Sequence, residues 1–407
     1  MRKNLKLGLF GFGCVGQGLY HVLEETQGVK AEIKKICVKT KNKTRPLSED
    51  LFTFSREEIL NDPEIDVVVE LIDDANAAYE IVKESLLRGK AVVTANKKML
   101  AEHLAELYEL QKQTGKPLLY EGAVCGSIPI LRNLEEYYDN DLISSIEGIF
   151  NGSTNYILTK VFEENRSYSE ALAKAQELGF AESDPRLDVQ GYDAKYKLVL
   201  AIAHTFGVFV RPEDVANIGI DRISDIDLKF ARENHYTIKL IARAFKIKNR
   251  IYGFVAPQFV KDLHPLASVR NEYNAVQVEG AFAEKQLFIG KGAGSYPTGS
   301  AVLSDVSALT YDYAYEYKKL HQGAQFEFSN DLLVDAFVSF DHKTPISISD
   351  FEQFKSGYAA NGKQYMVGRV RLTRLLEWHE SYGAGVILAP DSVFVPAALI
   401  DKKVVAI

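Results

Sequence analysis

The 407-residue sequence has little cysteine, no excess of basic charge and no long apolar run. Its three cysteines, Cys14, Cys37 and Cys125, are far apart and form no CxxC pair, which argues against a disulfide framework and a zinc knuckle. The net charge of −7 argues against a nucleic-acid partner, because binding phosphates requires a concentrated basic surface. No run approaches the roughly 18 apolar residues of a membrane span. We therefore expect a soluble protein of the reducing cytoplasm, with neither nucleic acid nor membrane as a partner.

With 46% hydrophobic and 25% charged residues, the chain is ordinary for a globular protein and long enough for two or three domains. Short apolar runs alternate with helical patterns up to about residue 120, which is typical of a parallel sheet covered by helices. The predicted strands are Lys6 to Phe10, Ile33 to Val38, Val67 to Leu71, Ala91 to Thr94 and Leu118 to Tyr120. The fold class is therefore α/β, with a Rossmann-type doubly wound sheet in residues 1–130 that a returning helix near residues 297–320 completes.

The alternation of predicted strands and helices ends after Pro129. From there one predicted strand is followed by three predicted helices and then by further strand-like segments. Residues 131–296 are therefore predicted to form a second, α+β domain. Residues 331–407 form a C-terminal tail with several strand-like runs, in which we find no βαββαβ pattern. The role of the tail stays open at this stage.

A glycine-rich turn, Gly11-Phe-Gly13-Cys-Val-Gly16, follows the first predicted strand and opens a helix. Gly11 allows a tight turn, Gly13 lets the backbone approach a pyrophosphate, and Gly16 lets helix and strand pack closely. The helix N-terminus presents free N–H groups to the anion. Alone, such a turn occurs in many α/β proteins, but its place after the first strand of a βαβ series indicates dinucleotide binding.

The residues after the second strand bear on the choice of dinucleotide. NAD-binding versions of this motif place an acidic residue about 20 residues beyond the turn, where it binds the ribose hydroxyls. Here Val38 is followed by a basic segment without an acid, from Lys39 to Arg45. Because cations suit a 2′-phosphate, the sequence favours NADP over NAD, although a solvated basic loop would look the same.

Four carboxylates, Glu182, Asp184, Asp188 and Asp193, lie within a dozen residues, immediately before an apolar helix. Asp193 and Lys197 are four residues apart and therefore neighbours on one helix face. Most such pairs are surface ion pairs of little consequence. Here, however, the pair lies beside several carboxylates at the start of a helix whose apolar sequence predicts burial. This position also fits a site that binds a substrate ammonium and has an adjacent proton donor.

This segment, AESDPRLDVQGYDAKYK (residues 181–197), resembles the signature of homoserine dehydrogenases. Other motifs of that family follow in order: VVVELI (67–72), GKAVVTANK (89–97), EGAVCGSIP (121–129), NGSTNYIL (151–158), HPLASV (264–269) and GKGAGSYPTGSAVLSD (290–305). The resemblance spans about three quarters of the chain and is highly specific. It implies an NAD(P)-dependent enzyme that interconverts L-homoserine and L-aspartate 4-semialdehyde in the biosynthesis of threonine, methionine and isoleucine.

The resemblance also implies roles for individual residues. Lys197 is the catalytic lysine and Lys97 a second lysine at the same site. An ammonium supplies both the proton and charge stabilisation. The sequence leaves open which lysine transfers the proton, and we favour Lys197. The substrate site comprises Glu182, Asp188, Asp193, Gly152 and Thr154. The cofactor site comprises Gly11, Gly13, Cys14, Val15, Gly16, Lys39, Thr94, Asn96, Lys97 and Gly292. A monovalent cation, sodium or potassium, is implied at Glu121, Val124, Gly126 and Ile128.

Three further expectations concern the chain as a whole. With the dinucleotide turn beginning at Gly11, we expect a monofunctional enzyme without a fused aspartate kinase. The resemblance implies a homodimer or homotetramer built on the sheet of the second, catalytic domain. The sequence leaves feedback by threonine open, because the tail shows no convincing βαββαβ pattern of a regulatory domain.

Two alternative functions remain. A semialdehyde dehydrogenase could use Cys125 as its nucleophile, although this cysteine lies in an apolar-flanked glycine turn with no histidine nearby, where a lone cysteine is usually a packing residue. A non-catalytic dinucleotide-binding regulator could share the scaffold. Both lysines and the carboxylate set argue against the regulator.

Overall fold

The structure, a computed structural model, describes residues 4–41, 43–140, 142–322, 326–360, 362–390 and 392–397. The chain divides into two units. Unit 1 combines Met1–Asp141 with Leu200–Phe209 and Gly290–Gln322, and unit 2 combines Leu142–Val199 with Val210–Ile289 and Gly323–Ile407. Each unit is described by itself below.

Unit 1 is built on a six-stranded parallel sheet, in the order β3-β2-β1-β4-β5-β6. Its strands are β1 (Leu5–Phe10), β2 (Ala31–Cys37), β3 (Phe52–Thr53), β4 (Val67–Glu70), β5 (Ala91–Thr94) and β6 (Leu118–Leu119). All four residues of β4 are buried, which is why the central strands read as continuous apolar runs in the sequence. The predicted Rossmann-type sheet is confirmed. The short strand β3 was not expected.

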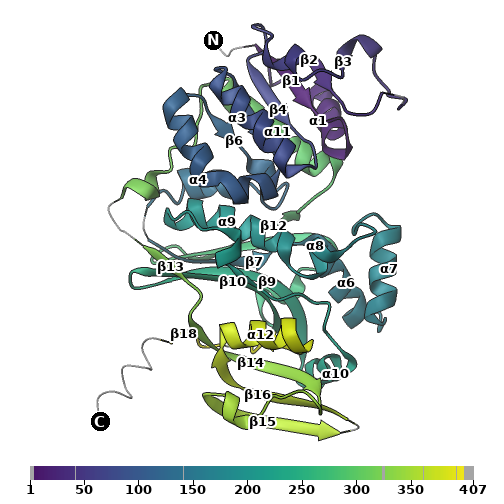
Figure 1. The fold of residues 1–407 in the computed structure, drawn as a ribbon, viewed down its shortest axis with the longest axis vertical. Helices are drawn as coiled ribbons and strands as arrows, with labels where there is room; N and C mark the ends of the chain where they lie inside the picture. Colours follow the sequence, from purple (N-terminus) through teal and green to yellow (C-terminus); the bar gives the residue numbers. More distant parts are fainter. Residues whose placement is uncertain are drawn as a thin grey trace. The chain divides into compact units, whose positions relative to one another are not determined.

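Helices cover both faces of this sheet (Figure 1): α1 (Cys14–Glu25), α2 (Glu57–Leu60), α3 (Ala75–Leu87), α4 (Lys97–Thr114), α5 (Ile130–Glu136) and α11 (Ser295–Leu309). Asp74 and Asn96 cap α3 and α4 by accepting backbone N–H groups. The strand order reverses between β1 and β4, and in such sheets ligands bind at the carboxyl ends of the strands beside the reversal. Helix α11 returns to pack on α1, where a Cβ on Gly18 would lie 2.0 Å from the Ser295 carbonyl oxygen.

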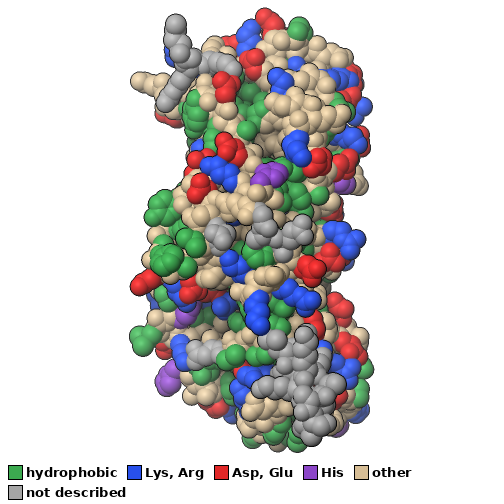
Figure 2. Space-filling view, turned by 90° about the vertical axis from the view of Figure 1, so that its left-hand side faces the viewer, with side chains coloured by type: hydrophobic (Ala, Val, Ile, Leu, Met, Phe, Trp, Pro, Cys, Tyr) green, Lys and Arg blue, Asp and Glu red, His purple; other side chains and the backbone are tan. Residues whose placement is uncertain are grey.

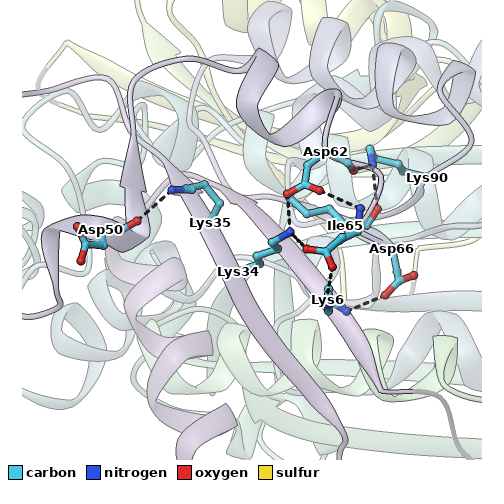
Figure 3. Close-up of polar contacts among 9 residues, drawn as sticks. Lys6, Lys34, Lys35, Asp50, Asp62, Ile65, Asp66 and Lys90 are labelled. Atoms are coloured by element: carbon cyan, nitrogen blue, oxygen red, sulfur yellow. Dashed lines mark hydrogen bonds and ion pairs between the residues drawn. The ribbon is translucent and has the colours of Figure 1, made fainter.

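At the amino ends of the same strands, lysine side chains join neighbouring segments (Figure 3). The Lys90 ammonium, which is 6% exposed, donates to the carbonyl oxygens of Asp62 and Ile65 at 2.6 and 2.9 Å. Lys34 pairs with Asp62 at 2.8 Å, and the backbone N–H of Lys6 donates to Asp66 at 2.8 Å. Because Lys90 joins the loop before β4 to β5 through two backbone carbonyl groups, we assign this end of the sheet a structural role.

Unit 2 is built on a mixed sheet whose main path has the order β12-β11-β7-β9-β10-β17-β14-β16-β15. Antiparallel pairs predominate. Strands β9 and β10, each of twelve residues, form a hairpin, while β10 and β17 run parallel. The strands are β7 (Ile143–Ile149), β8 (Ala216–Asn217), β9 (Tyr236–Ile247), β10 (Arg250–Lys261), β11 (Tyr273–Gly280), β12 (Glu284–Lys291), β13 (Glu327–Ser329), β14 (Leu332–Asp341), β15 (Gln353–Ala360), β16 (Lys363–Arg371), β17 (Gly385–Leu388) and β18 (Val395–Pro396). The second, α+β part of the predicted fold is confirmed.

The remaining helices are α6 (Gly152–Glu163), α7 (Tyr168–Glu177), α8 (Arg186–Val189), α9 (Tyr192–Phe206), α10 (Asp225–Glu233) and α12 (Leu372–Tyr382). Six short 3-10 turns join the elements: η1 (Glu49–Leu51), η2 (Glu121–Ala123), η3 (Pro212–Asp214), η4 (Pro265–Ser268), η5 (Lys318–His321) and η6 (Ile348–Asp350). In the described part of the chain, no helix combines the length and the apolar character needed to cross a bilayer.

The C-terminal tail is more ordered than its sequence suggested. Its elements follow as β14, η6, β15, β16, α12 and β17, and the four strands lie in the order β17-β14-β16-β15. This is the strand order of a ferredoxin-like βαββαβ unit in which a 3-10 turn, η6, replaces the first helix. The pattern escaped detection because that first helix is missing. The tail shares its core with the rest of unit 2, since Trp378 and Leu375 of α12 pack in one cluster with Phe254 of β10.

Lys and Arg side chains are interspersed with Asp and Glu over the described part of the face seen in Figure 2. Opposite charges that alternate in this way cancel at distances beyond about 10 Å at ordinary ionic strength.

Candidate functional site

The glycine turn after β1 has the geometry that each of its glycines was predicted to serve. Gly11 has φ 95°, and a Cβ there would lie 2.6 Å from the Leu71 carbonyl oxygen. A Cβ on Gly16 would lie 2.6 Å from the Gly11 carbonyl oxygen, so helix α1 could not pack as closely with a side chain there. Gly13, by contrast, has no heavy atom within 4 Å of its Cβ position. The protein leaves open the space above Gly13, beside the first residues of α1, Cys14 and Val15.

A buried carboxyl group that the sequence analysis missed organises the carboxyl ends of β4 and β5. Glu70 is fully buried, and it accepts hydrogen bonds from Thr94 Oγ1 and from the Ile72 backbone N–H, both at 2.6 Å. Burial raises the pKa of Glu70 to about 7. Thr94 Oγ1 also accepts the Asn96 backbone N–H at 3.0 Å, and Asn96 caps α4, which begins at Lys97. A glutamate that interrupts an apolar run at a strand end was the available signal.

The segment after β2 keeps its basic character. No acidic residue lies between Cys37, where β2 ends, and Arg45, and Lys39 is exposed. The Arg45 guanidinium donates to the carbonyl oxygens of Lys43, at 3.0 Å, and Thr40. It also lies 5.0 Å from the centre of the Phe52 ring. Arg45 therefore shapes this loop, while Lys39 faces solvent.

In unit 2, Lys197 and Asp193 meet at the start of α9, as their spacing predicted. Lys197 Nζ donates to Asp193 Oδ2 at 2.7 Å and to the Phe150 carbonyl oxygen, at the end of β7, at 2.8 Å. The two side chains are 8% and 9% exposed. An ion pair this protected from water is much less screened than a surface pair. The alternative of a solvent-exposed surface pair is wrong.

Asn151 joins the carboxylates, and the sequence analysis gave it no role. Its Nδ2 group donates to Asp188 Oδ1 at 2.7 Å and to Asp193 Oδ2 at 2.9 Å. Its Oδ1 accepts the Thr154 backbone N–H at 2.8 Å and so caps α6. Asn151 is 4% exposed. The asparagine that opens the NGSTN motif, directly before a helix, was the only local signal for this residue.

The other predicted substrate residues differ in their placement. Gly152 and Thr154 lie in the first turn of α6, next to Asn151, and a Cβ on Gly152 would lie 2.5 Å from the Glu272 carbonyl oxygen. Glu182 is exposed, and within the described chain no hydrogen bond links it to Asn151 or Lys197. The structure thus brings Asp188, Asp193 and Lys197 together around Asn151 and leaves Glu182 outside this cluster.

The residues predicted to hold a cation lie in unit 1. Glu121 is 3% exposed, and its two carboxylate oxygens accept the backbone N–H groups of Leu131 and Arg132, each at 2.9 Å. Asp305 accepts the Glu121 N–H and pairs with the Arg132 guanidinium at 2.9 Å. Burial, with the nearby Asp305 carboxylate, raises the pKa of Glu121 to about 8. The guanidinium of Arg132 thus pairs with Asp305, while its backbone N–H donates to Glu121.

The turn that continues from Glu121 brings the remaining predicted ligands close to Gly292. Val124, Cys125 and Ile128 are buried, and Gly126 has φ 54°. A Cβ on Gly126 would lie 2.7 Å from the backbone of Gly292, which places these two predicted sites in contact within unit 1. Because Cys125 is 0% exposed, its thiol is shielded from any dissolved substrate.

Comparisons with known proteins agree with this geometry. The sequence model of the family "Homoserine dehydrogenase" matches residues 129–307, and that of "Homoserine dehydrogenase, NAD binding domain" matches residues 11–121. The homoserine dehydrogenase of Bacillus subtilis is 40% identical over 316 residues, which cover 75% of this chain and 73% of the relative.

Solved structures extend the likeness into the tail. A homoserine dehydrogenase from Thiobacillus denitrificans superposes with a TM-score of 0.83 at 28% identity, covering 96% of this chain and 99% of its own. A hyperthermophilic archaeal homoserine dehydrogenase mutant in complex with NADPH gives a TM-score of 0.66 at 25% identity, covering 77% of this chain and 99% of its own. Neither the thiol-dependent alternative nor the non-catalytic alternative finds support. The chain belongs to the homoserine dehydrogenase family.

Proposed function

We propose that Lys197 moves the proton in the reaction of this oxidoreductase, the interconversion of L-homoserine and L-aspartate 4-semialdehyde. A nicotinamide dinucleotide, when bound, supplies or accepts the hydride. An ammonium has three N–H donors, and Lys197 gives two of them to Asp193 and to the Phe150 carbonyl oxygen. The third is left for the oxygen of the substrate, to which it would deliver a proton as an alkoxide develops.

The buried pair of carboxylates supports binding of the amino group of the substrate. Asp188 and Asp193 accept from the same Asn151 amide, so their carboxylates lie next to one another. Two neighbouring carboxylates would attract the α-ammonium of homoserine, because an opposite charge nearby favours the ionised form of each group. We also propose that Gly152 and Thr154 line the site, and that Glu182 adds a third carboxylate on binding.

Replacing Lys197 tests this proposal. Lys197→Ala is expected to lower turnover of homoserine by several orders of magnitude, because the proton donor and its positive charge are both lost. Dinucleotide binding, measured by fluorescence titration, should persist. Lys160→Ala is the matched control, since Lys160 forms an exposed i,i+4 pair with Glu164 on α6. Near-normal turnover of Lys197→Ala would remove Lys197 from the mechanism. Lys97→Ala, assayed in parallel, tests the second proposed lysine.

We further propose that the cofactor is NADP rather than NAD. The exposed Lys39 and the absence of an acid between Cys37 and Arg45 support this preference, and the archaeal relative was solved with NADPH. The remaining proposed contacts are Gly11, Gly13, Cys14, Val15, Gly16, Thr94, Asn96, Lys97 and Gly292. Steady-state oxidation of homoserine with each dinucleotide measures the preference. Lys39→Ala should raise KM for NADP and leave KM for NAD unchanged.

A monovalent cation fits the charge of the Glu121 site. Among the described residues, the Arg132 guanidinium pairs with Asp305, while Glu121 accepts backbone N–H groups, so an ionised Glu121 carries a buried negative charge without a paired side-chain cation. We propose that sodium or potassium binds there, held by Glu121 and by the main-chain oxygens of Val124, Gly126 and Ile128. Stabilisation by sodium or potassium chloride, but not by tetramethylammonium chloride at equal ionic strength, would support the site. Equal melting temperatures in the three salts would count against it.

Two proposals concern the whole protein. We propose a homodimer or homotetramer built on the sheet of unit 2, which light scattering coupled to gel filtration would detect. We also propose a cytoplasmic location, supported by a sequence with only three cysteines, which are far apart and form no CxxC pair. Fractionation of cells followed by the activity assay tests this location.

A further inference from the structure

Residues 216–222, here called the strap, run along the segment that separates Asp188 from Asp193. The Ile220 N–H donates to the Val189 carbonyl oxygen at 2.7 Å, and Asn217 Nδ2 donates to the Gln190 carbonyl oxygen at 2.8 Å. Gln190 Nε2 in turn donates to Asp221 Oδ2 at 3.4 Å. The strap therefore holds both residues that directly follow Asp188 in the chain.

The strap and this segment are packed so closely that no side chain would fit at Gly219. A Cβ on Gly219 would lie 2.4 Å from the Val189 carbonyl oxygen and 2.5 Å from Gln190 Cα. Gly191 has φ 82°, a left-handed conformation that residues with a side chain rarely adopt. Because close-packed groups move together rather than independently, a displacement of the strap would be passed on to Asp188 and Asp193.

The opposite side of the strap contacts the C-terminal tail. Ala216 and Ile218 belong to the same hydrophobic cluster as Leu375 and Trp378 of α12. His379 Nε2, in the last turn of α12, lies 3.7 Å from Asp221 Oδ1. A Cβ on Gly385, which begins β17, would lie 3.0 Å from the Arg222 carbonyl oxygen. The tail thus meets the strap through apolar packing, through the side-chain contact of His379 with Asp221 and through close backbone contact.

We infer that the tail positions Asp188 and Asp193 for the amino group of the substrate, acting through the strap, and that Asp221 is the positioning residue at the junction. Asp221 has Gln190, from the carboxylate segment, on one side and His379, from the tail, on the other. It touches neither substrate nor cofactor. The inference rests on the proposed binding of the substrate ammonium by Asp188 and Asp193, and it gives the tail a role in affinity for homoserine.

The test separates affinity from stability in the full-length protein. Asp221→Ala should raise KM for homoserine about five- to tenfold, as expected when one hydrogen bond that orders a binding segment is lost, while kcat and KM for the dinucleotide stay unchanged. Asp221→Asn keeps an acceptor for Gln190 and should recover part of this loss. His379→Ala should raise KM for homoserine in the same direction. Glu377→Gln is the control, because Glu377 lies on α12 but pairs with the exposed face of Arg374.

The outcomes distinguish the possible failures. If Asp221→Ala, Asp221→Asn and His379→Ala lower the melting temperature but leave KM for homoserine unchanged, the strap is only structural and the inference is overturned. If Asp221→Ala does not fold, Asp221→Asn and His379→Ala decide the question by the same KM measurement. Asp193→Asn separates this result from the proposed function: unchanged KM in that variant would show that the carboxylates do not bind the substrate, whatever the tail does.

Discussion

Replacing Asn151 tests the geometry of the site most directly, because one carboxamide performs two tasks that can be separated. Its Nδ2 group joins Asp188 and Asp193, and its Oδ1 caps α6 through the Thr154 N–H. A serine hydroxyl can serve as the N-cap but is too short to reach both carboxylates. Alanine loses both interactions. Comparing Asn151→Ser with Asn151→Ala therefore separates the positioning of the carboxylates from the stability of the helix.

The expected magnitudes follow from the interactions that each variant loses. Hydrogen bonds to charged groups contribute about 1.5 to 3 kcal/mol, and a lost N-cap costs about 1 kcal/mol. Asn151→Ser should therefore lower kcat/KM for homoserine roughly 10- to 100-fold, with a small change in the free energy of unfolding. Asn151→Ala should show the same kinetic loss with about 1 kcal/mol of additional destabilisation. Asn151→Asp should lose more activity than either, because a third carboxylate would repel the other two.

The assay is steady-state oxidation of L-homoserine, followed through the nicotinamide absorbance, together with urea unfolding of each variant. KM for the dinucleotide is measured in the same assay as an internal control, because the two interactions described for Asn151 are with Asp188 and Asp193 and with the Thr154 N–H. If Asn151→Ser kept kcat/KM within about twofold of the wild type, Asn151 would not be needed to place the carboxylates. Its role would then be limited to capping α6.

Two further predictions concern unit 1. Gly13→Ala should have the melting temperature of the wild type, because no heavy atom lies within 4 Å of the added Cβ. It should nevertheless bind the dinucleotide more weakly in a fluorescence titration. Gly16→Ala should instead lower the melting temperature, because its Cβ would lie 2.6 Å from the Gly11 carbonyl oxygen. Equal melting temperatures for the two would contradict this. In buffers without sodium and potassium, burial raises the pKa of Glu121 to about 8. The folded state then holds a proton that the unfolded state releases near pH 4.5, so the free energy of unfolding should fall as pH rises from about 4.5 to 8, by up to about 1.4 kcal/mol per unit. Glu121→Gln should flatten this slope in urea unfolding measured at several pH values, and an unchanged slope would exclude Glu121 as its source.

Part of this protein was readable from the sequence because the governing interactions are local. The strands of unit 1 read as apolar runs since a parallel sheet is covered on both faces, and β5 was located at its observed bounds, Ala91–Thr94. The glycine turn follows from the backbone freedom of glycine. The contact of Asp193 with Lys197 follows from helix geometry alone, because residues four apart share a face.

The arrangement around this pair was decided by tertiary structure. Asn151 meets Asp193 across 42 positions of sequence, and Asp221 meets His379 across a far longer interval. The tail completes the sheet of unit 2 through β17, although its sequence lacks the first helix of the pattern that would have revealed it. Such contacts depend on how strands pair and helices pack. The sequence around a residue therefore does not reveal a contact partner that is distant in the chain. The sequence by itself therefore determined which chemical groups are present and the turns and helices that carry them, whereas only the folded chain determined which of those groups are buried together.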